Sequence, residues 1–117
     1  MKSKEAIAAF GALASEARLA VYRLLVKRGP QGFTPSAIAG RLSLPGPTLS
    51  FHLKGLMQAG LVVSRRDGRH LHYSPNLDRM QDLVGFLTEN CCSLADAAAC
   101  GPIHQPESIA PLKRRRA

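Results

Sequence analysis

Apolar residues recur every three or four positions in several stretches of the chain, a spacing that places them on one face of an α-helix. In residues 3–14 the predicted apolar face consists of Ile7, Phe10, Leu13 and Ala14. A second helix is predicted to end near Arg28, with Ser15 as its N-cap and Gly29-Pro30 as its stop. Its predicted apolar stripe consists of Leu19, Tyr22, Leu25 and Val26.

Two helices separated by a tight turn are predicted next. Thr34 or Ser36 can cap the first of them, whose buried side is expected to hold Ile38, Ala39 and Leu42. Residues 44–47, Leu-Pro-Gly-Pro, are expected to form a rigid non-helical turn because proline disfavours helix in the residue before it. Thr48 is then the expected N-cap of a helix that reaches about Ala59, directly before Gly60.

The periodicity changes after Gly60. Two β-rich runs, residues 61–65 and 70–73, flank the dipeptide Asp67-Gly68, which favours a tight hairpin turn. Asn76 or Asp78 is expected to begin a last long helix. Its apolar positions are Met80, Leu83, Val84 and Leu87.

This order of elements predicts a mainly α, α+β fold, the winged helix-turn-helix, with about five helices and a two-stranded β-hairpin wing. The domain is expected to cover residues 1–90 and to carry DNA binding and dimerisation. Residues 91–117 are rich in alanine, proline and charge, and a partly disordered, cysteine-bearing tail is expected there. The stripe of the last helix has little else to bury against in so small a domain, which favours a homodimer.

Composition narrows the function. The 117 residues suit one domain, and the net charge of +8 favours a polyanionic partner as much as it favours mere solubility. Residues 113–116 supply four of those charges, and the rest of the chain still carries +4. These four residues can serve as a solubilising end or as a phosphate-binding tail. We expect no membrane span and no signal peptide, and the odd number of cysteines favours a reducing cytoplasm. No catalytic constellation is recognisable, so an enzyme is not expected.

A recognition helix needs one face on the domain and one face free for DNA. In residues 48–58 three leucines cluster on one side, and Ser50, Lys54 and Gln58 point to the other, with Thr48 on the flank. Phe51 also points outward, and either contact with a thymine methyl or packing against a neighbouring helix would explain it. His52 lies near the edge of the apolar side, where a packed histidine and a DNA contact are both open.

Arginines surround the predicted hairpin turn. Arg65, Arg66 and Arg69 can reach backbone phosphates or the minor groove if the hairpin lies beside a recognition helix. A solvated hairpin tip is the alternative. A protein-interaction module would leave the basic outward side of residues 48–58 without a purpose, and salt-dependent binding to duplex DNA separates the two interpretations.

Three sequence features together resemble the ArsR/SmtB family of metal-responsive repressors. They are TLSFHLKGL at residues 48–56, AGLV at 59–62, and RRDGR at 65–69 followed by Tyr73; Ser15, Arg18 and Leu19 also match. The resemblance covers residues 5–90. It implies a homodimer built from the first and last helices and bound to a short palindrome in double-stranded operator DNA.

Cys91, Cys92 and Cys100 are the only cysteines, and all three follow the last predicted helix. Three thiolates form a soft, sulfur-only donor set that suits As(III) or Sb(III), whereas zinc would need a fourth ligand such as His104. No organic cofactor is expected. The Cys-x-Cys pair typical of the family is absent from residues 34–37, and the tail instead resembles an arsenite-responsive subgroup with C-terminal cysteines.

Helix geometry constrains the third cysteine. Residues 93–96 resemble a capping box, and a straight helix over residues 94–100 would hold Cys92 and Cys100 about 12 Å apart, too far to share an ion. We therefore expect a loop here, or a Cys100 from the partner chain. The resulting hypothesis is a repressor that ion binding releases from its operator. A thiol redox switch, or no metal response at all, is the alternative.

Overall fold

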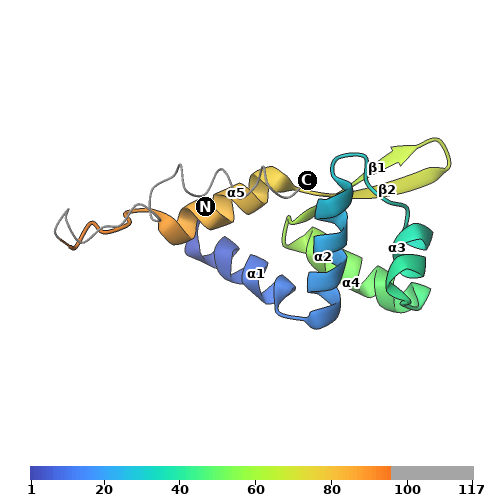
Figure 1. The fold of residues 1–117 in the computed structure, drawn as a ribbon, viewed down its shortest axis with the longest axis horizontal. Helices are drawn as coiled ribbons and strands as arrows, with labels where there is room; N and C mark the ends of the chain where they lie inside the picture. Colours follow the sequence, from blue (N-terminus) through green and yellow to red (C-terminus); the bar gives the residue numbers. More distant parts are fainter. Residues whose placement is uncertain (96–117) are drawn as a thin grey trace.

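The computed structural model describes residues 1–95, which form five helices and one two-stranded antiparallel sheet (Figure 1). The elements are α1 (Ser3–Leu13), α2 (Glu16–Arg28), α3 (Pro35–Leu42), α4 (Gly46–Gln58), β1 (Val62–Asp67), β2 (His70–Pro75) and α5 (Leu77–Thr88). The predicted winged helix-turn-helix is confirmed, with α3 and α4 as the helix pair and β1–β2 as the wing. No helix in residues 1–95 combines the length and the apolar composition needed to cross a membrane.

Polar side chains begin three of the helices. Ser15 Oγ accepts the Arg18 backbone N–H at 3.4 Å, and Thr34 Oγ1 accepts that of Ala37 at 3.3 Å. At α5, Asn76 Oδ1 accepts the Arg79 N–H at 3.2 Å. Thr34 and Asn76, rather than Ser36 and Asp78, are therefore the caps. Each such cap stabilises its helix by about 1 kcal/mol.

The start of α4 differs from the prediction. The helix begins at Gly46 with Pro45 as its N-cap, so the expected non-helical turn through Pro47 and the expected capping role of Thr48 were both wrong. The backbone N–H groups in the first turn of a helix have no acceptor within the helix. Pro47, which lacks an N–H, can therefore occupy the second position of α4 without loss of a hydrogen bond. Thr48 is the third residue of α4 and is exposed.

A single apolar core joins the helices to the base of the hairpin. Its buried residues are Ala6, Ala9, Ala12, Val21, Tyr22, Leu25, Ile38, Leu49, Leu53, Leu56, Ala59, Leu61, Val62 and Leu83. Two predicted stripes were partly wrong. Helix α1 buries Ala6, Ala9 and Ala12 and leaves Ile7 70% and Phe10 40% exposed, and α2 leaves Leu19 43% exposed while Val21 is buried. Both sides of α1 are apolar, so periodicity alone could not choose between them.

The wing is fixed at its base by the loop before α3. Strands β1 and β2 pair from Val62↔Pro75 to Asp67↔His70, and Gly68 has a φ of +64° in the two-residue turn. Phe33 and Tyr73 exchange two backbone hydrogen bonds of 2.9 and 2.8 Å. A Cβ at Gly32 would lie only 2.6 Å from the Tyr73 carbonyl oxygen, so this close approach requires glycine.

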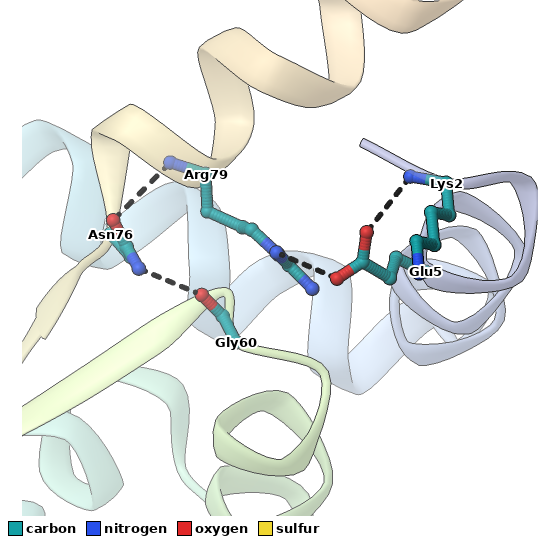
Figure 2. A network of polar contacts seen from close by, with 5 residues as sticks. All are labelled: Lys2, Glu5, Gly60, Asn76 and Arg79. Carbon is teal, nitrogen blue, oxygen red and sulfur yellow. Dashed lines mark hydrogen bonds and ion pairs between the residues drawn. The ribbon is translucent and has the colours of Figure 1, made fainter.

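A polar network joins α5, the end of α4 and α1 (Figure 2). Besides capping α5, Asn76 donates its side-chain N–H to the Gly60 carbonyl at 3.0 Å. Arg79, one turn further on, forms an ion pair of 3.6 Å with Glu5 of α1. Glu5 also accepts the Lys2 backbone N–H at 2.8 Å. The end of α4 is thereby connected to α5 through Asn76 and to α1 through Arg79 and Glu5.

These contacts change the acidity of Glu5. The Lys2 backbone N–H lowers the pKa of the carboxyl below 4.5, the nearby Arg79 guanidinium lowers it further, and desolvation acts in the opposite direction. A carboxyl with a lowered pKa stabilises the fold above its unfolded-state pKa and loses that contribution as pH falls through the folded-state value.

We therefore expect Glu5→Gln to lower the urea midpoint at pH 6–7, and we expect the difference from the native protein to shrink as pH falls below 4.5. The measurement is urea unfolding followed by circular dichroism across this pH range. Asp82→Asn, which changes an exposed carboxylate of α5 outside the network, serves as the control. A difference that stays constant with pH would contradict the assignment of the ion pair and hydrogen bond to the ionised carboxyl.

Candidate nucleic-acid interface

Helix α4 has one side that is buried in the core and one bare side, which is exposed to solvent. Leu49, Leu53 and Leu56 are at most 2% exposed, as the sequence predicted. The opposite side is exposed and carries Thr48, Ser50, Phe51, Lys54, Met57 and Gln58. A helix with this division can present side chains to another molecule without disturbing the core.

Two grooves flank this bare side. One lies against α1 and α2 and is lined by Ala8, Ala12, Arg18 and Phe51. The other lies against α3 and β2 and is lined by Pro35, Ser50, Met57 and Tyr73, among others. Lys54 and Gln58 line both grooves, so they form the crest of a ridge. A helix that stands out between two hollows has the shape needed to enter a DNA major groove, which is about 12 Å wide.

Phe51 and His52 meet an arginine of α2. Arg18 Nε donates to His52 Nδ1 at 3.3 Å, and Arg18 Cζ lies 5.3 Å from the centre of the Phe51 ring. The two rings contact each other edge to face, with centroids 5.6 Å apart. Phe51 remains 64% exposed, whereas His52 is half-buried. Phe51 is therefore available to a ligand, and His52 is engaged from within the protein.

The arginines of the wing do not behave alike. Arg65, Arg66 and Arg69 are all exposed, as is His70 beside them. Arg65 Nη2 donates to the Gln31 carbonyl at 3.1 Å, which ties its side chain to the loop before α3. Arg66 and Arg69 lie nearer the turn, at the far end of the hairpin from the domain (Figure 1).

A second basic cluster lies at the loop before α3, and the sequence interpretation missed it. The guanidinium carbons of Arg28 and Arg41 lie 5.1 and 4.9 Å from the centre of the Phe33 ring. Arg28 Nε also donates to the Gly32 carbonyl at 3.1 Å. Each cation–π contact at an exposed site contributes about 0.5–1 kcal/mol. These contacts hold two positive charges close to Gln31, the anchor of Arg65.

Charge is unevenly distributed in the fold. Residues 35–75, from α3 through β2, contain the basic residues Arg41, Lys54, Arg65, Arg66 and Arg69 and one acidic residue, Asp67. Residues 77–88 of α5 contain two aspartates and one arginine. The bare side of α4 and the wing therefore present a positive surface, which suits a phosphate backbone.

Two of the predicted ion ligands follow α5. Cys91 and Cys92 are both half-buried, and their Sγ atoms lie 3.5 Å apart. The Cys91 backbone N–H donates to the Thr88 carbonyl at 3.1 Å, and Cys92 has a φ of +63°. Cys100, like His104 and residues 113–116, lies outside the described residues. Within residues 1–95 no three His, Cys, Asp or Glu side chains form a group that could hold a metal ion.

Comparison with known proteins agrees with this geometry. A helix-turn-helix domain family matches residues 13–65. An uncharacterised HTH-type transcriptional regulator of Bacillus subtilis, YceK, is 35% identical over 67% of this chain and 78% of its own length. A probable mercury resistance operon repressor of Streptomyces lividans is 34% identical over 77% of this chain and 68% of its own length.

Solved structures share the fold. An ArsR-like transcriptional regulator from Rhodococcus superimposes with a TM-score of 0.70 at 22% identity, covering 96% of this chain and 92% of the other. A homodimeric winged helix-turn-helix domain from Mycobacterium bovis, a possible ArsR-family regulator, gives 0.59 at 27%, covering 75% and 82%. A possible transcriptional regulator for arsenical resistance gives 0.55 at 27%, covering 66% and 77%.

Proposed function

Since the chain belongs to the ArsR/SmtB family of winged helix-turn-helix DNA-binding transcriptional regulators, we propose that it is a dimeric repressor released from its operator by a thiophilic metalloid ion. The observation that carries the DNA-binding half is the bare ridge of α4 beside a basic wing. The observation that carries the sensor half is the pair of thiols after α5, with Sγ atoms 3.5 Å apart.

In the proposed complex α4 enters the major groove. Lys54 and Gln58, at the crest of the ridge, contact a guanine or phosphate and an adenine respectively, because these are the base edges that their donors and acceptors match. Ser50 and Thr48 donate to bases or phosphates nearby. The exposed Phe51 ring contacts a thymine methyl, which gives an apolar side chain on a polar surface a partner.

The wing contacts the DNA backbone or the minor groove beside the major-groove site. Arg66 and Arg69 are the principal contacts, since they lie near the turn and no hydrogen bond is found for them among the described residues. Arg65 contributes less reach because Gln31 holds it near the domain. Its charge still lies in the same basic surface as Arg28 and Arg41.

The dimer forms through α1 and α5. The exposed apolar side chains of these helices include Ile7 and Phe10 on α1 and Leu87 on α5, at 70%, 40% and 61% exposure. Figure 1 shows the two helices together at the end of the domain away from the wing. A two-fold axis at this end places the two reading helices on one face of the duplex, about one helical turn apart. The homodimeric relative from Mycobacterium bovis supports this assembly.

The sensor is a thiolate site that begins at Cys91 and Cys92. Sulfurs bound to one ion at about 2.3 Å lie up to about 4 Å apart, and the observed 3.5 Å satisfies that limit without rearrangement. Cys100 supplies the third sulfur that As(III) or Sb(III) prefers. The relatives named for mercury and arsenical resistance support a soft, sulfur-seeking ion as the inducer.

The polar network of Figure 2 offers a physical route from this site to α4. The thiols follow the last turn of α5, and Asn76, its N-cap, donates to the Gly60 carbonyl just after α4. A 12-residue helix moves as a rigid rod of about 18 Å, so a change at one end reaches the other. Coupling of about 1–3 kcal/mol would weaken operator binding 5- to 150-fold.

The DNA-binding proposal predicts two kinds of loss of DNA affinity. Both are measured by fluorescence anisotropy, on a duplex that the purified protein has selected from random sequence. Arg66→Ala and Arg69→Ala should weaken binding to the selected duplex and to unrelated DNA alike, and each should lower the salt slope by about 1. Gln58→Ala should cost about 1–3 kcal/mol on the selected duplex alone.

Lys4→Ala, which removes an exposed charge of α1, is the control for net charge. If it weakened binding as much as the wing variants do, general electrostatics rather than contact would explain the losses. Failure of the native protein to bind any duplex at low salt would refute the proposed function.

The sensor proposal predicts that arsenite, in a reducing buffer, releases the native protein from DNA and leaves Cys91→Ser and Cys92→Ser bound. Both variants should bind DNA normally without the ion, which a gel shift shows directly. Ser93→Ala, an exposed neighbour, should respond like the native protein.

Three other outcomes have distinct meanings. Release of Cys91→Ser as readily as the parent would overturn the sensor assignment. Release by a thiol oxidant but not by arsenite would establish the redox alternative. No response to either reagent would identify a member without a thiol-based inducer.

A further inference from the structure

We infer that Arg18 of α2 is a positioning residue for the reading helix: its guanidinium group lies against the backbone of α4 at Gly55, holds His52 and, together with that ring, orients Phe51 toward DNA. The inference rests on the proposed role of α4 in reading DNA. It extends that role to a residue that precedes the helix-turn-helix pair.

The base of the Arg18 side chain is fixed by the N-terminus of α2. Arg18 is the third residue of this helix, and its backbone N–H is the donor to the Ser15 cap. The side chain extends from this fixed point across to α4, where it lines the groove that also contains Lys54 and Gln58. Arg18 itself is only half-exposed.

Gly55 makes the close approach possible. A Cβ at this position would lie 2.8 Å from Arg18 Cζ, 3.0 Å from Nη2 and 3.2 Å from Nε, so a side chain of any size at residue 55 would displace the guanidinium. Glycine inside a helix is less favourable than alanine, so its presence in the middle of α4 calls for a compensating contact. The Arg18 guanidinium is the group that occupies the space.

The two side chains that Arg18 contacts are adjacent on the reading helix. Its Nε–H donates to His52 Nδ1, which leaves the ring proton on Nε2. Its guanidinium lies 5.3 Å from the Phe51 ring centre, and His52 contacts the same ring edge to face. An exposed phenylalanine would otherwise sample several rotamers. Arg18 and His52 together favour one, so less conformational entropy is lost when the ring meets DNA.

Arg18 has no carboxylate partner: the ion pair found in residues 1–95 is the one between Glu5 and Arg79. Its uncompensated charge next to α4 raises the alternative of a direct phosphate contact. The two roles differ in salt dependence, because a lost phosphate contact lowers the salt slope by about 1 whereas a lost positioning contact does not.

The test uses Gly55→Ala, Arg18→Ala, Arg18→Lys and the double variant Gly55→Ala/Arg18→Ala, on the selected duplex and on unrelated DNA. Gly55→Ala keeps every charge and removes a helix-interior glycine. We expect it to fold with undiminished thermal stability and yet to bind the selected duplex at least about fivefold more weakly, the lower limit for one lost base contact.

Arg18→Ala and Arg18→Lys should show a similar loss, because lysine keeps the charge but lacks the planar group that stacks on Phe51. Binding to unrelated DNA and the salt slope should stay unchanged for Gly55→Ala and Arg18→Lys. In the Arg18→Ala background Gly55→Ala should add nothing, since its effect acts through Arg18. Gly40→Ala, at an open position on α3, is the matched glycine control and should leave DNA binding unchanged.

A second readout needs no DNA. The ¹⁵N shifts of His52 should show the proton on Nε2 in the native protein and a mixture of tautomers in Arg18→Ala and Gly55→Ala. Full binding by Arg18→Lys together with a lower salt slope for Arg18→Ala would overturn the inference in favour of a phosphate contact. Unchanged binding by Gly55→Ala would also overturn it, whereas a native protein that ignores duplex DNA would refute the proposed function instead.

Discussion

Burial of Leu49, Leu53 and Leu56 on one side of α4 is the interaction on which the rest of the structure depends. Each leucine contributes about 1.5–3 kcal/mol when fully buried, and together they fix the rotation of the helix about its axis. The other side must then face outward, whatever residues it carries. Hydrogen bonds complete the placement from two directions, through Asn76 at the Gly60 carbonyl and through Arg18 at His52.

Much of this architecture could be predicted from the sequence because it depends on local rules. Apolar spacing located the five helices, and the Asp67-Gly68 dipeptide located the hairpin turn. Side-chain capping located the starts of α2, α3 and α5. The errors arose where tertiary context decided between locally equivalent choices. Pro47 was compatible with both a turn and a first helical turn, and α1 offered two apolar sides to the core.

The candidate site shows the same division between local and distant information. The bare side of α4 follows from a helical wheel, but the partners of its residues come from elements far away in the chain. His52 meets Arg18, 34 residues earlier, and Arg65 meets Gln31, also 34 residues earlier. Gly55 was the one local sign of such a contact, since a glycine inside a helix often marks a close approach of another group. The apolar periodicity of the helix by itself assigns no role to Gly55.

The buried alanines of α1 have a consequence for abundance in the cell. Because Ala6, Ala9 and Ala12 face inward, the helix leaves the larger apolar side chains of Ile7 and Phe10 exposed. A single copy of the chain therefore keeps the unfavourable free energy of this apolar surface in water, which burial would remove. In the proposed dimer these side chains would be covered, so folding and association would draw on one shared free energy and the thermal midpoint would rise with protein concentration. A cell that makes few copies would hold a larger share of them as less stable single chains, open to proteases. The number of working repressors would then fall more steeply than synthesis itself.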